Sequence, residues 1–374
     1  MTSRGEHSRR DFLKGRGAAQ TLTDKLQKWA DKHVRPLVAA AEDRSSLHVQ
    51  ASRRAMACDF EVQYHATDVD AADPVMEAFD LIESIEDQLT IYRKHSEVID
   101  INRSAAEGPV RVEPHLFALL EHAARLFHET HGAFDLTSTP LSQTWGFMRR
   151  EGRVPVAGEI EAALALVGFD KVLLDDTNCT IQFREPGVQI NFNSIGKGYA
   201  LDRAAAHLDE QGVSDYLWHG GRSSVLARGR NRADSGRCWT LGLRDPVEPS
   251  RRLAEFYLRD RALATAGGGT QFFEHDGKTY SHVIDPRTGW PAQGVTTATA
   301  LAPTAAEADA LATAFFVMGV ESAAEYCAAH REIAAVLVCP TPDDAPPSDG
   351  AGVLLHAWGL DEEDWNRLEQ ASSR

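Results

Sequence analysis

The spacing of apolar residues changes near the middle of this chain, from that of a strand to that of a helix. Between Val188 and Phe192 they stand at every second position, which predicts a half-buried strand. Further on they recur at the spacing of a buried helix face, at Tyr199, Leu201, Ala204, Ala205 and Leu208. The two patterns meet at a short segment that contains Ser194, Gly196, Lys197 and Gly198. The sequence therefore predicts a glycine-containing turn that leads from a strand directly into a helix.

This turn has two interpretations. Glycines let the backbone approach a ligand closely, free amides at a helix start attract anions, and Lys197 adds a positive charge. These features favour a phosphate site, although the spacing is not that of a P-loop, which ends in Gly-Lys-Ser or Gly-Lys-Thr. A tight turn followed by a solvated lysine fits the same residues. The local pattern leaves both interpretations open.

The amino-terminal half of the chain mixes strand and helix patterns. Alternating apolar residues predict a strand over Asp59–His65, and helical spacing predicts a helix from Asp73 to Leu89. The other expected elements are a helix from Pro114 to just before Gly132, a short helix over Glu159–Val167, and a hairpin of Lys171–Asp175 with Thr180–Phe183.

The carboxyl-terminal half is richer in strands, which are expected at Tyr216–Trp218, Ser223–Ala227, Trp239–Leu243, Thr296–Ala302 and Ala334–Cys339. Ala306–Val317 reads as a strongly apolar helix, and the small residues of Ala262–Gly269 predict a turn. A strand that begins at Tyr280 runs into a proline-containing turn. After Pro340, an acidic loop is expected to precede a helix over Trp358–Glu369.

Composition excludes several classes of protein. The 374 residues carry a formal charge of −16, which argues against a nucleic-acid partner because phosphate binding needs clustered Lys and Arg. No apolar run is long enough for a membrane-spanning helix. The five cysteines are dispersed and lack a Cys-x-x-Cys spacing, so neither a disulfide framework nor a zinc site is expected.

Residues 1–50 form a charged leader. Its segment Ser8–Lys14 is similar to a twin-arginine export motif, but charges interrupt Gly15–Ala41, where a signal peptide needs an apolar stretch. A charged, partly helical leader and a degenerate relic of an export signal both stay open. The expected location is cytoplasmic or, if the twin-arginine-like start functions, periplasmic. No lipobox cysteine stands near the start, so a lipid anchor is not expected.

Two polar constellations could carry chemistry. Asp309 and Thr313 lie one turn apart on the apolar helix, and such oxygen donors suit Mg²⁺, which takes few protein ligands. Favourable placement near a helix start would explain Asp309 equally well, with Thr313 bonding back to the helix. His282 could act as a general base or serve as a hydrogen-bonded structural residue. Arg287 could contact a phosphate or pair with a surface carboxylate.

The motifs taken together resemble those of the ApbE family of FAD:protein FMN transferases, from about Arg54 to Cys339. The segments that carry the resemblance are Tyr92 with Ser96-Glu97 and Asn102, Gly132–Thr137, Trp145–Phe147, Ile195–Ala200, Ala262–Thr265, Ser281–Gly289 and Ala308–Ala314 with Met318-Gly319. The resemblance implies a T-fold-like α+β fold with mixed β-sheets flanked by helices. It assigns residues 51–340 to a FAD-binding transferase domain. Residues 341–374, beyond the resemblance, are expected to hold an acidic loop and a C-terminal helix.

The same resemblance implies a Mg²⁺-dependent reaction. FAD is split at its pyrophosphate, FMN passes to a Thr or Ser of an acceptor flavoprotein, and AMP leaves. Ser194, Asp309 and Thr313 match the metal site, and His282 matches the acid/base position. The positions that match FAD contacts are Met56, Tyr92, Ala133, Phe134, Asp135, Asn191, Lys197 and Val283.

Some positions depart from the family pattern. Asn191 and Arg222 stand where the family commonly has Asp, Met56-Ala57-Cys58 where it has Met-Gly-Thr, and Asn193–Gly196 where it has Gly-Gly-Ile-Ala. Asn191 loses a charge and Arg222 reverses one. Two alternatives therefore stay open: a FAD-binding protein without transferase activity, and a metal-dependent FAD pyrophosphatase that releases free FMN.

Overall fold

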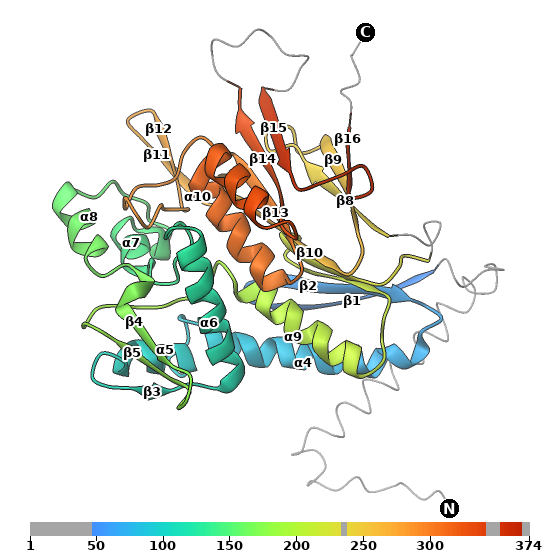
Figure 1. The fold of residues 1–374 in the computed structure, drawn as a ribbon, viewed down its shortest axis with the longest axis horizontal. Helices are drawn as coiled ribbons and strands as arrows, with labels where there is room; N and C mark the ends of the chain where they lie inside the picture. The colour runs from blue at the N-terminus through green and yellow to red at the C-terminus, as the bar shows by residue number, and fades with distance from the viewer. Residues whose placement is uncertain (1–46, 233–237, 342–351, 369–374) are drawn as a thin grey trace, which may run out of the picture.

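The computed structural model describes residues 47–232, 238–341 and 352–368 (Figure 1). The helices are α4 (Ala72–Leu89), α5 (Glu97–Ser104), α6 (Pro114–Glu129), α7 (Thr139–Thr144), α8 (Ala157–Leu164), α9 (Gly196–Glu210) and α10 (Ala305–Ala329). The strands are β1 (His48–Ala55), β2 (Cys58–His65), β3 (Val110–Arg111), β4 (Val172–Asp175), β5 (Thr180–Phe183), β6 (Tyr216–Gly220), β7 (Ser224–Arg228), β8 (Trp239–Arg244), β9 (Arg252–Leu258), β10 (Arg261–Gly267), β11 (Phe272–His275), β12 (Lys278–Ser281), β13 (Thr297–Ala302), β14 (Ala334–Pro340), β15 (Val353–Trp358) and β16 (Trp365–Arg367).

An eight-stranded sheet in the order β1-β2-β6-β7-β10-β13-β14-β15 is the centre of the molecule. Every strand pair in the described part of the chain is antiparallel. The α+β class, with β-sheets flanked by helices, is confirmed. The expected β4–β5 hairpin and the helices α4, α6 and α8 are present. Among these described residues, no helix is both long and apolar enough to cross a bilayer.

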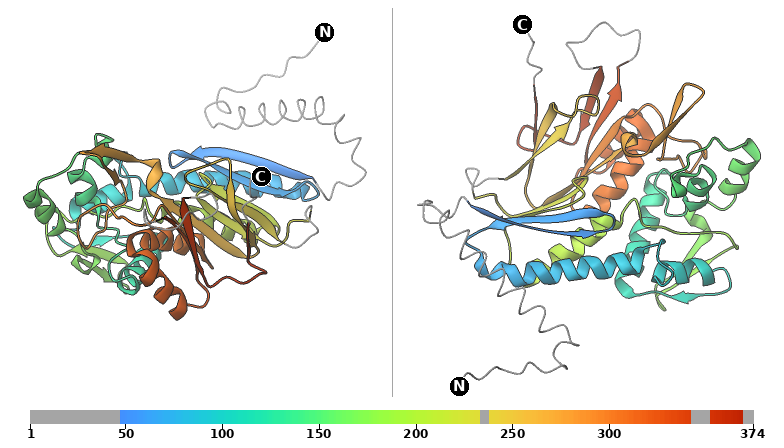
Figure 2. Two further views of the ribbon diagram at one scale, coloured as in Figure 1. Left: turned by 90° about the horizontal axis from the view of Figure 1, so that it is seen from above. Right: turned by 180° about the vertical axis from the view of Figure 1, so that it is seen from behind.

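The two faces of the large sheet are covered differently. Helices α4, α9 and α10 pack on one face, and the three-stranded sheet β16-β9-β8 packs on the other (Figures 1 and 2). Small side chains on β10 and β13 lie under α10, while the alternate residues Leu263 and Leu301 face the second sheet. Because strand side chains alternate between faces, alanines at every second position let α10 approach the sheet closely.

A helical lobe lies beside this sandwich. It contains α5 to α8 and the small sheet β3-β5-β4, and its apolar core includes Leu141, Trp145 and Ile160 (Figure 1). The indole nitrogen of Trp145 donates to the carbonyl of Gly289 at 2.8 Å, which ties the lobe to the turn after His282. The functional site lies where the lobe meets α10.

The strand expected over Val188–Phe192 is wrong, although the segment is buried as its alternation predicts. It belongs to none of the sheets. Instead, the Asn102 side chain accepts from the Ile190 amide at 2.8 Å and donates to the Ile190 carbonyl at 2.9 Å. The Asn191 amide donates to the carbonyl of Leu136 at 3.0 Å. A side-chain amide thus satisfies the backbone groups that a neighbouring strand would otherwise bind.

The turn expected over Ala262–Gly269 is also wrong, because residues up to Gly267 form strand β10 in the middle of the sheet. Small residues here serve the close approach of α10 rather than a change of chain direction. The apolar helix does extend past Gly319, but Gly319 has φ +79° and ψ −172°, so the helix that begins at Ala305 is broken there.

The ends of the chain differ from expectation as well. The helix predicted over Trp358–Glu369 is wrong: Val353–Trp358 pairs with β14, and Trp365–Arg367 pairs with β9. The ring of Trp365 stacks on Phe256 with 6.3 Å between centroids, and the two residues are paired across strands β16 and β9. The boundary expected at residue 50 falls inside a strand, because β1 begins at His48. Residues 1–46 and most of the acidic loop, 342–351, lie outside the described residues.

Candidate functional site

The start of α9 and the start of α10 cross in close contact. Gly198 has no side chain because a Cβ there would lie 2.0 Å from the carbonyl oxygen of Ala305. Asp202, one turn further along α9, accepts from the backbone amides of Ala305 and Ala306, both at 2.8 Å. These amides are unpaired at the first turn of a helix, so Asp202 caps α10 from a neighbouring element. The sequence between Ile195 and Asp202 therefore fixes where α10 begins.

Asp309 lies in the second turn of α10 and is almost completely buried. Its two carboxylate oxygens accept from the Gly198 amide at 2.7 Å and the Ser224 hydroxyl at 2.5 Å. Burial raises the pKa of Asp309, and the nearby Lys197 ammonium and the two hydrogen bonds oppose that rise. A buried carboxylate facing a lysine and a cavity is typical of a functional group.

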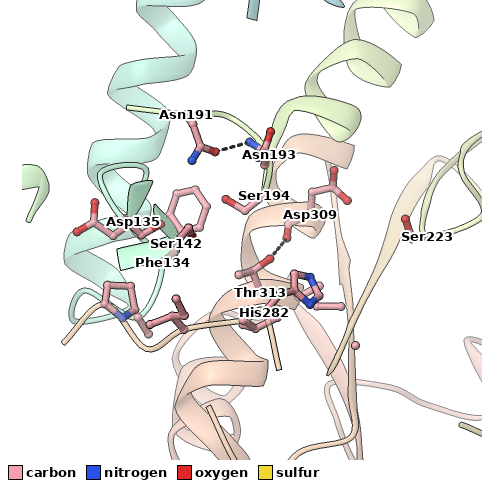
Figure 3. A pocket seen from close by; sticks show the side chains of 18 of the residues that line it. Phe134, Asp135, Ser142, Asn191, Asn193, Ser194, Ser223, His282, Asp309 and Thr313 are labelled. Carbon is pink, nitrogen blue, oxygen red and sulfur yellow. Dashed lines mark hydrogen bonds between the residues drawn. The ribbon is translucent and has the colours of Figure 1, made fainter. Parts of the chain in front are cut away.

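Asp309, Thr313 and Ser194 bring three oxygen-bearing side chains close together (Figure 3). The Thr313 hydroxyl donates to the Asp309 carbonyl at 3.3 Å, and Ser194 lies opposite, at the turn before α9. Within the described ranges, His, Cys, Asp and Glu nowhere cluster in threes as a metal site built from these residues would require. The protein ligands of a cation here would be the carboxylate of Asp309, the hydroxyl of Thr313 and an oxygen of Ser194. This hard-oxygen set fits Mg²⁺, which completes its coordination with water and phosphate.

These residues line a cavity of about 390 Å³, which we call the inner cavity. It lies between the helical lobe, α10 and the turn that contains His282 (Figure 3). Its lining residues are Ala133, Phe134, Asp135, Ser138, Ser142, Met148, Asn191, Asn193, Ser194, Lys197, Ser223, Thr265, Ala266, Gly267, His282, Val283, Ile284, Pro286, Asp309, Ala312 and Thr313. One side of the cavity is thus charged and polar, and the lobe contributes an aromatic ring.

His282 has a defined tautomer. Its Nδ1 lies 3.0 Å from the carbonyl oxygen of Gln271, and a carbonyl can only accept, so the proton is on Nδ1. The lone pair of Nε2 is therefore available to accept a proton. Burial lowers the pKa of His282, with the Gln271 hydrogen bond opposing, so the ring is neutral at pH 7. The residue has the properties of a general base.

Asp135 and Asn191 form the lobe side of the inner cavity. The Asp135 Oδ1 accepts from both the amide and the hydroxyl of Thr137 at 2.7 Å, and burial raises the Asp135 pKa to about 6. Asn191 donates to the Thr139 hydroxyl at 2.7 Å and accepts from the Asn193 amide at 2.9 Å. An aspartate at position 191 could not donate to Thr139, so this Asn has its own hydrogen-bonding partner.

A side cavity of about 310 Å³ adjoins the inner cavity, with which it shares Asn193 and Lys197. Met56, Tyr92 and Phe192 also line this side cavity. Tyr92 is 69% exposed, so its ring is accessible to a ligand. Met56 lies in the two-residue turn between β1 and β2 and has φ +48°. Lys197 therefore lies where a ligand spanning both cavities would have its middle.

All twelve residues singled out by sequence line one of the two cavities, although nothing here tests their individual roles. Arg287 does not take part: it forms a bidentate pair with Asp285 at 2.9 Å, the alternative reading of this residue. Sequence reasoning missed the roles of Ser224 and Asp202. A carboxylate among the apolar positions of α9 was a signal for Asp202, whereas Ser224 reaches Asp309 only through the pairing of β7 within the sheet.

The fold and the site define a class of protein: an antiparallel α+β sandwich with an internal cavity lined by the oxygens of Asp309, Thr313 and Ser194. The sequence model of the ApbE family matches residues 56–337. The FAD:protein FMN transferase of Klebsiella pneumoniae is 33% identical over 257 residues, which cover 68% of this chain and 77% of that protein. A Vibrio cholerae protein of the same name is 32% identical over 267 residues, covering 70% and 78%.

Solved structures agree with this assignment. The crystal structure of the ApbE protein from Thermotoga maritima superposes with a TM-score of 0.71 at 29% identity, covering 78% of this chain and 94% of that one. The flavin transferase ApbE of Vibrio cholerae gives 0.72 at 29% identity, covering 83% and 97%. The chain belongs to the ApbE family.

Proposed function

We propose that this protein is a Mg²⁺-dependent FAD:protein FMN transferase. The acceptor is a flavoprotein that carries the modified Thr or Ser, and AMP is released. The observation that carries this proposal is the inner cavity, which the buried Asp309 lines together with Lys197 and His282. A phosphate site and a neutral base in one cavity are what transfer of a phosphoryl group to a hydroxyl requires.

Mg²⁺ would be held by Asp309, Thr313 and Ser194, whose oxygens fit its preferences. When bound, it neutralises charge on the pyrophosphate of FAD. Lys197, at the start of α9, would neutralise part of the same negative charge. It lines both cavities. The side cavity and the inner cavity then take the two ends of the dinucleotide. Tyr92 and Phe134 provide aromatic surface for the rings, one in each cavity.

His282 accepts the proton of the acceptor hydroxyl on Nε2 while Nδ1 stays bonded to Gln271. The hydroxyl oxygen forms a bond to the phosphorus of the FMN half, and the phosphorus–oxygen bond to the AMP half breaks. FAD and acceptor are thereby converted to FMN-acceptor phosphoester and AMP, with no change of oxidation state. The lowered pKa of His282 keeps the ring unprotonated for this step at pH 7.

The decisive experiment is mass spectrometry of the full chain incubated with FAD, Mg²⁺ and an acceptor domain that the Vibrio cholerae relative modifies. Transfer predicts that the acceptor gains the mass of FMN while AMP accumulates, and that a chelator prevents both. Free FMN and AMP without a modified acceptor would establish a FAD pyrophosphatase instead. Intact bound FAD would establish a flavin-binding protein, provided that the Vibrio cholerae enzyme modifies the acceptor in parallel.

A further inference from the structure

His282 lies between two cavities rather than at the end of one. Besides the inner cavity, it lines a second cavity of about 580 Å³, which we call the outer groove. The other residues of the outer groove are Phe147, Arg150, Glu151, Gly152, Gln271, Phe272 and Phe273. A base that borders two cavities can take the proton of a hydroxyl that enters through one of them and attacks a phosphorus held in the other.

The walls of the outer groove are held by close packing. Gln271 Nε2 donates to the carbonyl of Phe147 at 2.8 Å, and the rings of Phe147 and Phe273 lie 5.6 Å apart. A Cβ on Gly152 would lie 2.5 Å from the Phe273 ring, so the loop after Phe147 is pressed against β11. The outer groove is therefore a formed surface beside His282.

An accessible aromatic ring lies at the entrance to the outer groove. Phe272 is 52% exposed and lines the outer groove together with Phe147 and Phe273. It begins β11, which pairs only with β12 among the strands that the structure describes. The hairpin projects from the body in Figure 1 and in the right view of Figure 2. An exposed apolar residue on an unpaired strand edge is typical of a surface that binds an extended peptide.

We propose that the outer groove binds the acceptor protein as an extended segment. An apolar side chain near the acceptor hydroxyl lies against Phe272, and the hydroxyl itself reaches His282. This inference rests on the transferase function proposed above. The charges favour this occupant over FAD: the phosphate site formed by Lys197 and Asp309 belongs to the inner cavity, whereas Arg150 and Glu151 in the outer groove offset each other.

The geometry of phosphoryl transfer supports the same arrangement. The attacking and leaving oxygens lie roughly in line, on opposite sides of the phosphorus. With FAD in the inner and side cavities, the acceptor must enter from another side and must meet the base on its way. The outer groove is the cavity that offers His282 to such a group.

The test compares Phe272→Ser and Phe272→Leu with Met76→Ser, a control on α4 whose side chain is 49% exposed and lines none of these cavities. The substrate is the acceptor domain modified by the Vibrio cholerae relative, at saturating FAD and Mg²⁺. Phe272→Ser should raise the KM for the acceptor about tenfold, as expected for loss of an aromatic anchor. FAD affinity, measured by flavin fluorescence, should not change, and Phe272→Leu should restore most of the acceptor binding.

Three results would overturn the proposal. An unchanged acceptor KM in Phe272→Ser would show that the acceptor binds elsewhere, while the transferase function itself would stand. A weakened FAD affinity of the same size would make the outer groove part of the FAD site. Absence of transfer by the unmodified protein, with the Vibrio cholerae enzyme active in parallel, would remove both the function and this inference.

Discussion

The α-carbon of Gly198 faces the carbonyl oxygen of Ala305 so closely that an added methyl group would lie 2.0 Å from it. The same residue donates its amide to Asp309. One glycine therefore sets both the distance between α9 and α10 and the position of the buried carboxylate.

Replacing Gly198 by Ala should force the two helices apart and destabilise the protein by about 3 kcal/mol or more, the upper range for overpacking a core. Thermal unfolding of the two proteins would measure this loss. The matched control is Gly158→Ala in α8, where an added Cβ meets nothing within 4 Å. That change should be neutral or slightly stabilising, because alanine has the higher helix propensity. Equal stability of Gly198→Ala and the unmodified protein would contradict the contact.

Asp309→Asn should lower the rate of FMN transfer at least about a hundredfold, the usual scale for a group that stabilises developing charge. It should also weaken activation by Mg²⁺, which a titration of rate against metal concentration would detect. Glu307→Gln is the control: this carboxylate is also buried, two residues away on α10, but pairs with Arg125 at 2.7 Å. It should reduce stability and leave the metal dependence intact. A metal response that is equally altered in both variants would argue against a ligand role for Asp309.

The activity should persist below the pH at which an ordinary histidine becomes protonated. Burial lowers the pKa of His282 from 6.5, so the ring stays neutral and able to accept a proton further into the acidic range. The acidic limb of kcat/KM for the acceptor should therefore have its midpoint below pH 6.5. A rate profile between pH 5 and 8 measures it, and a midpoint above 6.5 would show that another group limits the reaction.

Asp135 should make stability fall as the pH rises. Its pKa is about 6 in the folded protein against 3.8 for a free aspartate, so the folded state holds its proton more tightly. The stabilisation is complete below pH 3.8 and is lost as the pH passes 6; the two values correspond to about 3 kcal/mol at most. In Asp135→Asn, chemical unfolding at pH 4 and 7 should show less of this decline. Asn retains an acceptor oxygen for Thr137, so the variant should fold.

Much of this fold is readable from local periodicity. The buried faces of α4, α6 and α9 and the alternation of β2 follow from spacing alone, because each element buries one side. The one-turn spacing of Asp309 and Thr313 likewise placed both on a common face. Periodicity does not predict the structure of a segment that is held by residues far away in the sequence. Val188–Phe192 alternates like a strand but is held by Asn102, and Ala262–Gly267 resembles a turn until α10 is seen to require its small side chains.

The site was harder to predict for the same reason. Ser224 is 85 residues from Asp309 in sequence, and only the order of strands in the large sheet brings the two together. Asp202 caps a helix that begins about a hundred residues later. The position of Asp202 among the apolar residues of α9 signals a buried role, but nothing in the local sequence indicates which group either residue contacts. The motifs could identify residues that share the site, but the hydrogen bonds that position them depend on the packing of whole elements.

Asp202 and Gly198 join the site to the core, and this has a consequence for cooperativity. The residues that clamp the start of α10 lie on α9, and both helices contribute buried side chains to the main apolar core. The surroundings of Asp309 depend on the contact between α9 and α10, because Gly198 of α9 donates its amide to Asp309 of α10. On heating, the site and the native state should therefore be lost in a single transition. Hydrogen exchange of the backbone amides around Asp309 should require global unfolding. The β11–β12 hairpin contributes no residue to that core, so we expect it to open without the unfolding of α9 and α10.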